Sequence, residues 1–317
     1  MGKILASIDI GSHTLRLLVA KESKMAGVFK PLARRRVYIR LAEGLTQSEK
    51  KIIPPRAMER ALNALQDFSG YINRFSVHSV RAVATGAVRE AANSVEFLDR
   101  IYAHTGIRAR PITGIEEALL SAKGALNALK IHAGPFVVFD LGGGSTEILI
   151  DGGGRRLVRS LPLGAMILTK RYLGSDPPEE TQVSALLRHI NQYLNEAKIC
   201  VPGQRAPSIF VGTGGTVTTL AVMLHRISAG DISVERINGL ILKRRRIEAL
   251  FSEIKNMSFG ERLRLPGLDK DRADVILAGC LVVISILRLF KSHQLTVSMS
   301  DLLEGILIES MNGVGND

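Results

Sequence analysis

The sequence predicts an α/β protein built from two domains that share one topology. The chain has 317 residues, which is more than one ordinary hydrophobic core accommodates. Short apolar runs typical of strands alternate with amphipathic segments typical of helices. A strand, an aspartate, a glycine turn and a second strand occur at 4–20 and again at 136–150. Such an internal repeat predicts two similar domains that face each other across a cleft.

The first domain is expected to span residues 1–118, beginning with the strand pair at 4–20. Its further elements are expected, in order, as a strand at 37–41, a helix at 58–72, a strand at 77–84, a helix at 95–103 and a strand at 107–112.

The second domain is expected to span residues 119–299, and a helix at about 300–317 can pack back on the first domain. Its elements are expected as strands at 136–139, 148–150, 157–163, 208–212 and 295–297, with helices at 164–173 and 183–194, near 247–254 and from 275.

Composition indicates a globular protein from a reducing compartment. Hydrophobic residues make up 46% of the chain and charged residues 23%. Cys200 and Cys280 match no zinc spacing and are too few for a disulfide scaffold, so we expect a cytoplasmic protein. The most apolar stretch, 275–290, is shorter than the roughly 20 residues that span a bilayer. We therefore expect a buried helix there and no membrane segment.

The charge balance favours a polyanionic partner. The formal net charge is +12, which suits nucleic acid, polyphosphate or a highly phosphorylated nucleotide. Aromatic residues make up only 5% of the chain, and the basic runs at 34–36 and 243–246 carry no interleaved aromatics. Nucleic acid is therefore an improbable partner, and each run alone is more often a solvated surface.

Three glycine-bearing turns each follow an apolar strand, and together they could surround a phosphate chain with backbone N–H donors. Their residues are Gly11, Ser12, His13 and Thr14; Gly142, Gly143, Gly144, Ser145 and Thr146; and Gly212, Thr213, Gly214, Gly215 and Thr216. Asp9, Asp140 and Glu147 add hard oxygen ligands without a histidine cluster, a combination that suits Mg²⁺.

Other chemistries are disfavoured by missing patterns. The seven histidines show no H-x-x-x-H pair, which argues against a zinc hydrolase. No G-x-S-x-G elbow, P-loop or complete dinucleotide fingerprint occurs.

Two further polar features follow predicted strands. Arg89 lies in the first turn of a helix after the strand at 77–84, where anions collect in open α/β sheets. Glu116 and Glu117 open another helix, a position that the helix dipole favours for acids in any protein. Only one of the two can easily point back toward the cleft.

These motifs resemble the exopolyphosphatase and guanosine pentaphosphate phosphohydrolase family of the acetate and sugar kinase/actin superfamily. The resemblance covers nearly the whole chain. It rests on segments 8–12, 40–45, Thr85 with Arg89, 114–118 (GIEEA), 140–147 (DLGGGSTE), 212–216 (GTGGT) and 265–268 (LPGL).

The resemblance implies two actin-like (ribonuclease H-like) domains and removal of a terminal phosphate from polyphosphate or from guanosine pentaphosphate (pppGpp). Glu117 would be the base that activates water, and Arg89 would bind phosphate. Asp140 and Glu147 would hold Mg²⁺, and the glycine turns would cradle the substrate. The family also makes a homodimer plausible.

The chain departs from the family pattern at His13, where the family usually has Asn, and at 302–303, where an Arg is usual. It resembles the short, two-domain form. Two alternatives stay open: a kinase-like phosphotransferase that uses polyphosphate or ATP, and a non-catalytic polyphosphate or nucleotide sensor. The glutamate pair favours the hydrolase.

Overall fold

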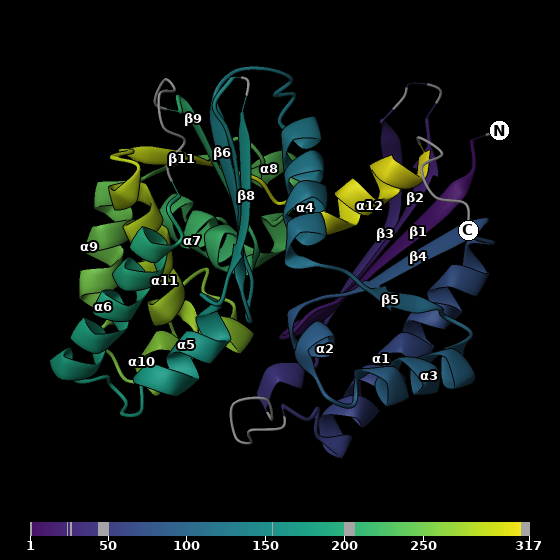
Figure 1. Ribbon diagram of the computed structural model, residues 1–317, viewed down its shortest axis with the longest axis horizontal. Helices are drawn as coiled ribbons and strands as arrows, with labels where there is room; N and C mark the ends of the chain where they lie inside the picture. Colours follow the sequence, from purple (N-terminus) through teal and green to yellow (C-terminus); the bar gives the residue numbers. More distant parts are fainter. Residues whose placement is uncertain are drawn as a thin grey trace. The chain divides into compact units, whose positions relative to one another are not determined.

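The computed structural model of the chain describes residues 2–23, 25, 27–43, 51–153, 155–199 and 207–311. Cys200, positions 44–45 of the quoted motifs and residues 312–317 lie outside the described residues. The chain divides into two compact units, Met1–Asn127 with Leu302–Asp317, and Ala128–Asp301 (Figure 1). Each unit is a mixed α/β structure around its own sheet, which confirms the predicted α/β class.

The described strands of the first unit form a five-stranded sheet in the order β3-β2-β1-β4-β5. β1 pairs antiparallel with β2 and parallel with β4, and β5 is parallel to β4. Their bounds are β1 (Ile4–Ile10), β2 (Thr14–Glu22), β3 (Phe29–Tyr38), β4 (Ser79–Ala84) and β5 (Ala109–Pro111).

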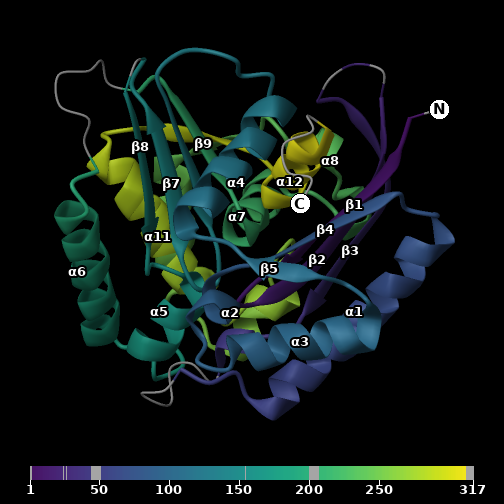
Figure 2. The ribbon, with the colours of Figure 1, turned by 45° about the vertical axis from the view of Figure 1, so that its right-hand side comes forward.

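Helices cover both faces of this sheet (Figure 2). On one face α12 packs its Leu303 and Leu307 against Leu5, Leu18 and Ala20 of the strands. On the other face α1 packs against β2 and β3, and α3 packs against α1. The helices are η1 (Leu41–Glu43), α1 (Pro55–Arg74), α2 (Gly86–Glu90), α3 (Ser94–Thr105), α4 (Gly114–Ala128) and α12 (Leu302–Met311).

The second unit repeats this topology. Its described strands follow the order β10-β11-β9-β6-β7-β8, in which β8-β7-β6-β9-β11 corresponds to β3-β2-β1-β4-β5. The bounds are β6 (Phe136–Leu141), β7 (Thr146–Asp151), β8 (Arg156–Leu161), β9 (Ile209–Thr213), β10 (Ile241–Lys243) and β11 (Gln294–Val297). The helices are α5 (Ala165–Tyr172), α6 (Glu180–Glu196), α7 (Gly215–His225), η2 (Ala229–Asp231), α8 (Val234–Ile237), α9 (Arg244–Ile254), α10 (Phe259–Arg262), η3 (Lys270–Arg272) and α11 (Ile276–Leu289).

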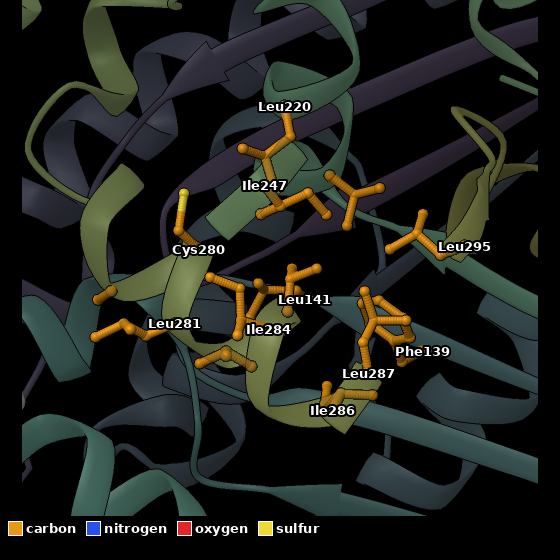
Figure 3. Close-up of a cluster of buried hydrophobic side chains, with 14 of the residues drawn as sticks. Phe139, Leu141, Leu220, Ile247, Cys280, Leu281, Ile284, Ile286, Leu287 and Leu295 are labelled. Atoms are coloured by element: carbon orange, nitrogen blue, oxygen red, sulfur yellow. The ribbon is translucent and has the colours of Figure 1, made fainter. Parts of the chain in front are cut away.

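The core of the second unit is centred on α11, which the apolar stretch at 275–290 predicted. Residues from Ile276 to Leu287 are all buried in this helix. Figure 3 shows Cys280, Ile284 and Leu287 among side chains of β6, α7 and α9. No helix of the described chain is both long enough and apolar enough to cross a membrane.

The third strand differs from the expected strand at 37–41. β3 runs from Phe29 to Tyr38 and forms the edge of its sheet. Its middle carries Arg34, Arg35 and Arg36, and an exposed edge strand with charged side chains shows no apolar alternation. The periodicity on which the prediction relied is therefore missing from this strand.

Candidate active site

The first unit brings three predicted features to one edge of its sheet. β1, β4 and β5 are parallel, so their carboxyl ends share that edge. The turn at 11–14 follows β1, Arg89 lies in α2 after β4, and Glu117 lies in α4 after β5. Each feature reaches the edge because it directly follows a parallel strand.

Two side chains of the turn at 11–14, which the sequence predicted to contact phosphate, pack against neighbouring elements of the first unit. The Ser12 hydroxyl accepts the N–H of Ala87 in α2 at 2.9 Å. The His13 ring is 5% exposed and lies edge-on to Tyr38, with ring centroids 5.2 Å apart. These contacts hold the turn against α2 and β3.

Asp9 immediately precedes this turn and is ion-paired. Arg16 of β2 is its register partner, and the Arg16 Nη2 and Asp9 Oδ2 atoms are 2.7 Å apart. Gly11 donates its N–H to the Thr14 carbonyl at 3.0 Å, which closes the turn beside the pair. A cation therefore already balances the Asp9 carboxylate, and its role as a metal ligand stays a prediction.

Glu117 is held as a buried carboxylate by Arg89. Its residue is 8% exposed, and the Arg89 Nη1 atom lies 3.1 Å from its Oε2. The same guanidinium nitrogen donates to the Ile112 carbonyl at 2.9 Å. Arg89 therefore joins the end of β5 to α4 and holds one Glu117 oxygen, while the second oxygen receives no bond from this guanidinium.

The neighbouring Glu116 is turned toward a different partner. Its carboxylate forms a two-bond ion pair with Arg110, and its N–H is capped by the Thr113 hydroxyl at 3.1 Å. Donating hydrogen bonds to Glu116 raises the pKa of the Arg110 guanidinium above its ordinary value. Glu116 thus lies in the first turn of α4 with Arg110 as its partner, whereas Glu117 contacts Arg89.

In the second unit, four oxygen-bearing residues form a row across four strands. Asp140 of β6 is the register partner of Glu147 in β7 and of Thr213 in β9. Glu147 is in turn the partner of Ser160 in β8. Directly opposed residues project from the same face of a sheet, so these side chains are neighbours. The Ser160 hydroxyl donates to Glu147 Oε1 at 2.7 Å.

The glycine turn at 142–145 joins β6 to β7 next to this row. Gly142 donates its N–H to the Ser145 carbonyl at 3.0 Å, and the first residues of α5 donate to the carbonyls of Gly142 and Gly143. Among the described residues, no acceptor is found for the N–H groups of Gly143 and Gly144. Two backbone donors in a tight turn can bind an anion such as phosphate.

Two threonines of the predicted loops have side chains directed into the unit. The Thr146 hydroxyl is fully buried and donates to the Leu163 carbonyl at 2.7 Å. Thr216 is 1% exposed and packs closely against Gly279 of α11. The Thr146 side chain thus bonds to the segment before α5, and the Thr216 side chain packs on α11.

The loop between β9 and α7 approaches the acid row closely. Gly214 has φ +93°, and a Cβ atom there would lie 2.8 Å from Asp140 Oδ1 and would overlap the Leu141 carbonyl. The Thr213 hydroxyl beside it is fully buried and has no hydrogen-bond partner in the described part of the chain. Only glycine allows this loop so near the carboxylate.

Arg272 is a residue of this region that sequence reasoning missed. Its guanidinium lies directly on Gly215, where any Cβ atom would overlap it. A cation therefore sits at the start of α7, beside the glycine loop. Arg272 follows the quoted LPGL segment, but it stands among other charged residues, and no spacing rule relates it to position 215.

The two carboxylates of the row fit a magnesium ion. Asp140 and Glu147 supply hard oxygens on one face, with the Thr213 hydroxyl next to them. No group of three or more His, Cys, Asp or Glu suited to a metal occurs among residues 2–311 where the structure describes them. Magnesium often uses only one or two protein carboxylates and completes its shell with water and substrate phosphates.

Comparison with known proteins places this geometry in a family. The model of the Ppx/GppA phosphatase family matches residues 18–313. Exopolyphosphatase 2 of Mycobacterium tuberculosis is 34% identical over 96% of this chain and 97% of its own length. A crystal structure of the Aquifex aeolicus Ppx/GppA family member has 30% identity and a TM-score of 0.82, covering 99% of both chains. An exopolyphosphatase structure from Cytophaga hutchinsonii has 27% identity and a TM-score of 0.89, again over 99% of both.

These matches extend over both units and over every predicted site residue from position 18 onward, and they agree with the actin-like fold class that the motifs implied. The chain belongs to the Ppx/GppA phosphatase family.

Proposed function

We propose that the protein is a phosphohydrolase that releases the terminal phosphate from inorganic polyphosphate, from pppGpp, or from both. Relatives that match nearly the whole chain are named exopolyphosphatases, which supports polyphosphate as a substrate. The observation that carries the proposal is the buried Glu117 carboxylate, oriented by Arg89 at the carboxyl edge of the first sheet.

Glu117 acts as the general base. Its oxygen accepts a proton from the attacking water, and the water oxygen bonds to the terminal phosphorus. The bond from that phosphorus to the bridging oxygen breaks, and the shortened chain leaves with that oxygen. Arg89 orients the carboxylate and is available to the terminal phosphate. The N–H groups of Gly143 and Gly144 donate to phosphate oxygens whose charge changes during transfer.

Asp140 and Glu147 are the residues that hold Mg²⁺ in this proposal. The ion, when bound, neutralises phosphate charge and so favours attack on phosphorus. Ser160 fixes one oxygen of Glu147 through its hydroxyl, at 2.7 Å. Such an outer-shell hydrogen bond orients a ligating carboxylate.

The test is Glu117→Gln, with Glu116→Gln as the matched control on the same helical turn. Phosphate release from long polyphosphate, tripolyphosphate, pppGpp and ATP is measured with Mg²⁺. Glu117→Gln should lower kcat by roughly 10²–10⁴-fold, the usual contribution of a general base. Substrate dissociation constants should stay within a few-fold. Glu116→Gln loses only a partly exposed pair with Arg110 and should keep wild-type turnover.

Wild-type turnover by the Glu117→Gln protein would refute the assignment of the base. Transfer of phosphate to ADP or to a sugar, in place of release into water, would favour the phosphotransferase. Tight binding without any release by the wild-type protein would favour a sensor. A homodimer is a separate proposal, tested by the mass of the particle in solution.

A further inference from the structure

The second unit carries a dense group of cations at the end of its sheet away from the glycine turns. β9 and β11 are parallel and lead toward the turn at 212–216, while β10 is antiparallel to them. The end of β10 and the start of β11 therefore lie at the far end. This group, called the basic end below, comprises Arg226, Lys243, Arg244, Arg245, Arg246, Arg288 and Lys291.

Hydrogen bonds show that the three segments of the chain that supply these residues lie side by side. Arg244 donates its N–H to the His293 carbonyl at 2.9 Å and a guanidinium N–H to the Ser292 carbonyl at 3.1 Å. These contacts join α9 to the segment after α11. Arg246 donates to the Leu224 carbonyl and so joins α9 to the end of α7.

The basic end has little acidic compensation. Glu248 of α9 pairs with Arg288 at 2.8 Å and lies 3.7 Å from Arg244. The other cations with exposed side chains have no acidic partner within the described ranges; these are Arg226, Lys243, Arg245 and Arg246 together with Lys291. Exposed like charges so close together repel one another, and a bound polyanion removes that repulsion.

The position of the basic run at the start of α9 adds a second unfavourable interaction to this repulsion. Lys243 caps α9, and Arg244 to Arg246 form its first turn, which contains no acidic residue. The helix dipole disfavours cations at this position. Local helix stability therefore does not account for four consecutive cations, whereas binding of an extended anion does.

We propose that the basic end holds the distal part of a long polyphosphate chain whose terminal phosphate lies at the glycine turns. This inference rests on the proposed function and deepens it by specifying a preference for long chains. α7 leads from the turn at 212–216 to the basic end, and its 11 residues correspond to about 16 Å. Tripolyphosphate and pppGpp held at the turns are too short to occupy the basic end as well.

A triple charge reversal, Arg226→Glu with Lys243→Glu and Arg245→Glu, tests the proposal. None of these side chains forms a hydrogen bond or ion pair within the described chain, so the fold should be kept, as checked by thermal unfolding. The matched control reverses three exposed cations elsewhere in this unit, one just before β8, one on α6 and one just after α6: Arg155→Glu, Arg188→Glu and Lys198→Glu.

The triple variant should raise KM for long polyphosphate at least about tenfold, the order expected when several cation–phosphate contacts are lost. Its kcat, and its KM for tripolyphosphate and pppGpp, should stay within about twofold of wild type. The control should behave as wild type with every substrate. Added KCl should raise the long-chain KM of the wild type more steeply than that of the triple variant.

An unchanged long-chain KM in the triple variant would overturn the proposal. An equal loss in the control would overturn it too, because net charge alone would then explain the effect. Weaker binding of a homopolymeric RNA, with the polyphosphate KM unchanged, would assign the surface to nucleic acid instead. If the wild type releases phosphate from no substrate, the proposed function fails. A binding experiment then tests the basic end by itself: equal affinity of wild type and triple variant for labelled long polyphosphate would refute its role in binding.

Discussion

Replacing Gly164 by alanine should displace the glycine turn at 142–145, which we propose binds phosphate. Gly164 precedes α5 with φ −81° and ψ 138°, a conformation that alanine adopts without strain. The added methyl would lie 2.5 Å from the carbonyl carbon of Gly143 and would overlap the Gly144 backbone. Ordinary contacts to a Cβ atom lie at 3.4–4 Å. Because the neighbours are backbone atoms, the turn and α5 must separate.

The magnitude follows from this overlap. The turn has to move by about 1 Å, and misplacement on that scale can cost about 10²-fold in rate. Overpacking of a well-packed site costs about 1–3 kcal/mol. Three backbone hydrogen bonds from α5 to the carbonyls of Gly142 and Gly143, at 3.0–3.2 Å, weaken at the same time. We expect about 2–4 kcal/mol of lost stability and at least about a 50-fold lower kcat/KM.

Urea unfolding measures the loss of stability, and phosphate release measures the loss of kcat/KM. Alanine substitutions at two other glycines serve as controls, because they change backbone freedom without any steric overlap. Gly153 has φ +80° and no atom within 4 Å of an added Cβ. Gly153→Ala should cost about 1–2 kcal/mol through backbone strain and leave activity unchanged. Gly70, inside α1 and also without a neighbour within 4 Å, should tolerate alanine with a gain of about 0.5–1 kcal/mol. Wild-type activity and stability in Gly164→Ala would refute the reasoning.

Three further predictions concern single side chains of the second unit. Ser160→Ala removes a hydroxyl bond to Glu147 and should raise the Mg²⁺ concentration for half-maximal activity by roughly 10-fold or more, with kcat nearly unchanged at saturating Mg²⁺. Burial raises the pKa of the Cys280 thiol to about 12, so iodoacetamide at pH 8 should label this thiol only after unfolding, as read by peptide mass spectrometry. Burial against two tyrosines, with the charge of Arg171 nearby, lowers the pKa of His189. The unfolded state then binds more protons, so unfolding free energy should fall as pH drops from the ordinary histidine pKa of about 6.5 toward the lowered one. Urea unfolding between pH 5 and 7.5 should show a smaller dependence in His189→Phe, and an identical slope would contradict the assignment.

The local sequence pattern was sufficient to predict the position of a polar residue that ends a buried apolar run. Asp140 ends an apolar run and begins a glycine turn, and the structure pairs it with Glu147 through the hairpin register. The buried character of α11 was equally readable, because its apolar residues are continuous. In both cases neighbours in sequence determine neighbours in space.

The sequence pattern did not predict contacts between residues that lie far apart in the chain. Arg272 reaches Gly215 only because the loop before α11 returns to the start of α7. Ser160 meets Glu147 through strand register across a second hairpin, and a one-residue slip in β8 would turn it to the other face. The two ion pairs of the glutamates were not predicted either, because Arg110 of β5 pairs with Glu116 whereas Arg89 of α2 pairs with Glu117.

The internal repeat supports the proposal that a metal ion binds in the second unit. Asp9 and Asp140 occupy equivalent positions, since each ends the central strand of its sheet and pairs with the following antiparallel strand. The partner of Asp140 is Glu147, whereas the partner of Asp9 is Arg16. A carboxylate that faces an arginine has its charge compensated, whereas two carboxylates that face each other add their negative charges. One fold used twice therefore carries an acid–base pair at this position in one unit and an acid–acid pair in the other, and this difference supports the proposal of Mg²⁺ at Asp140 and Glu147.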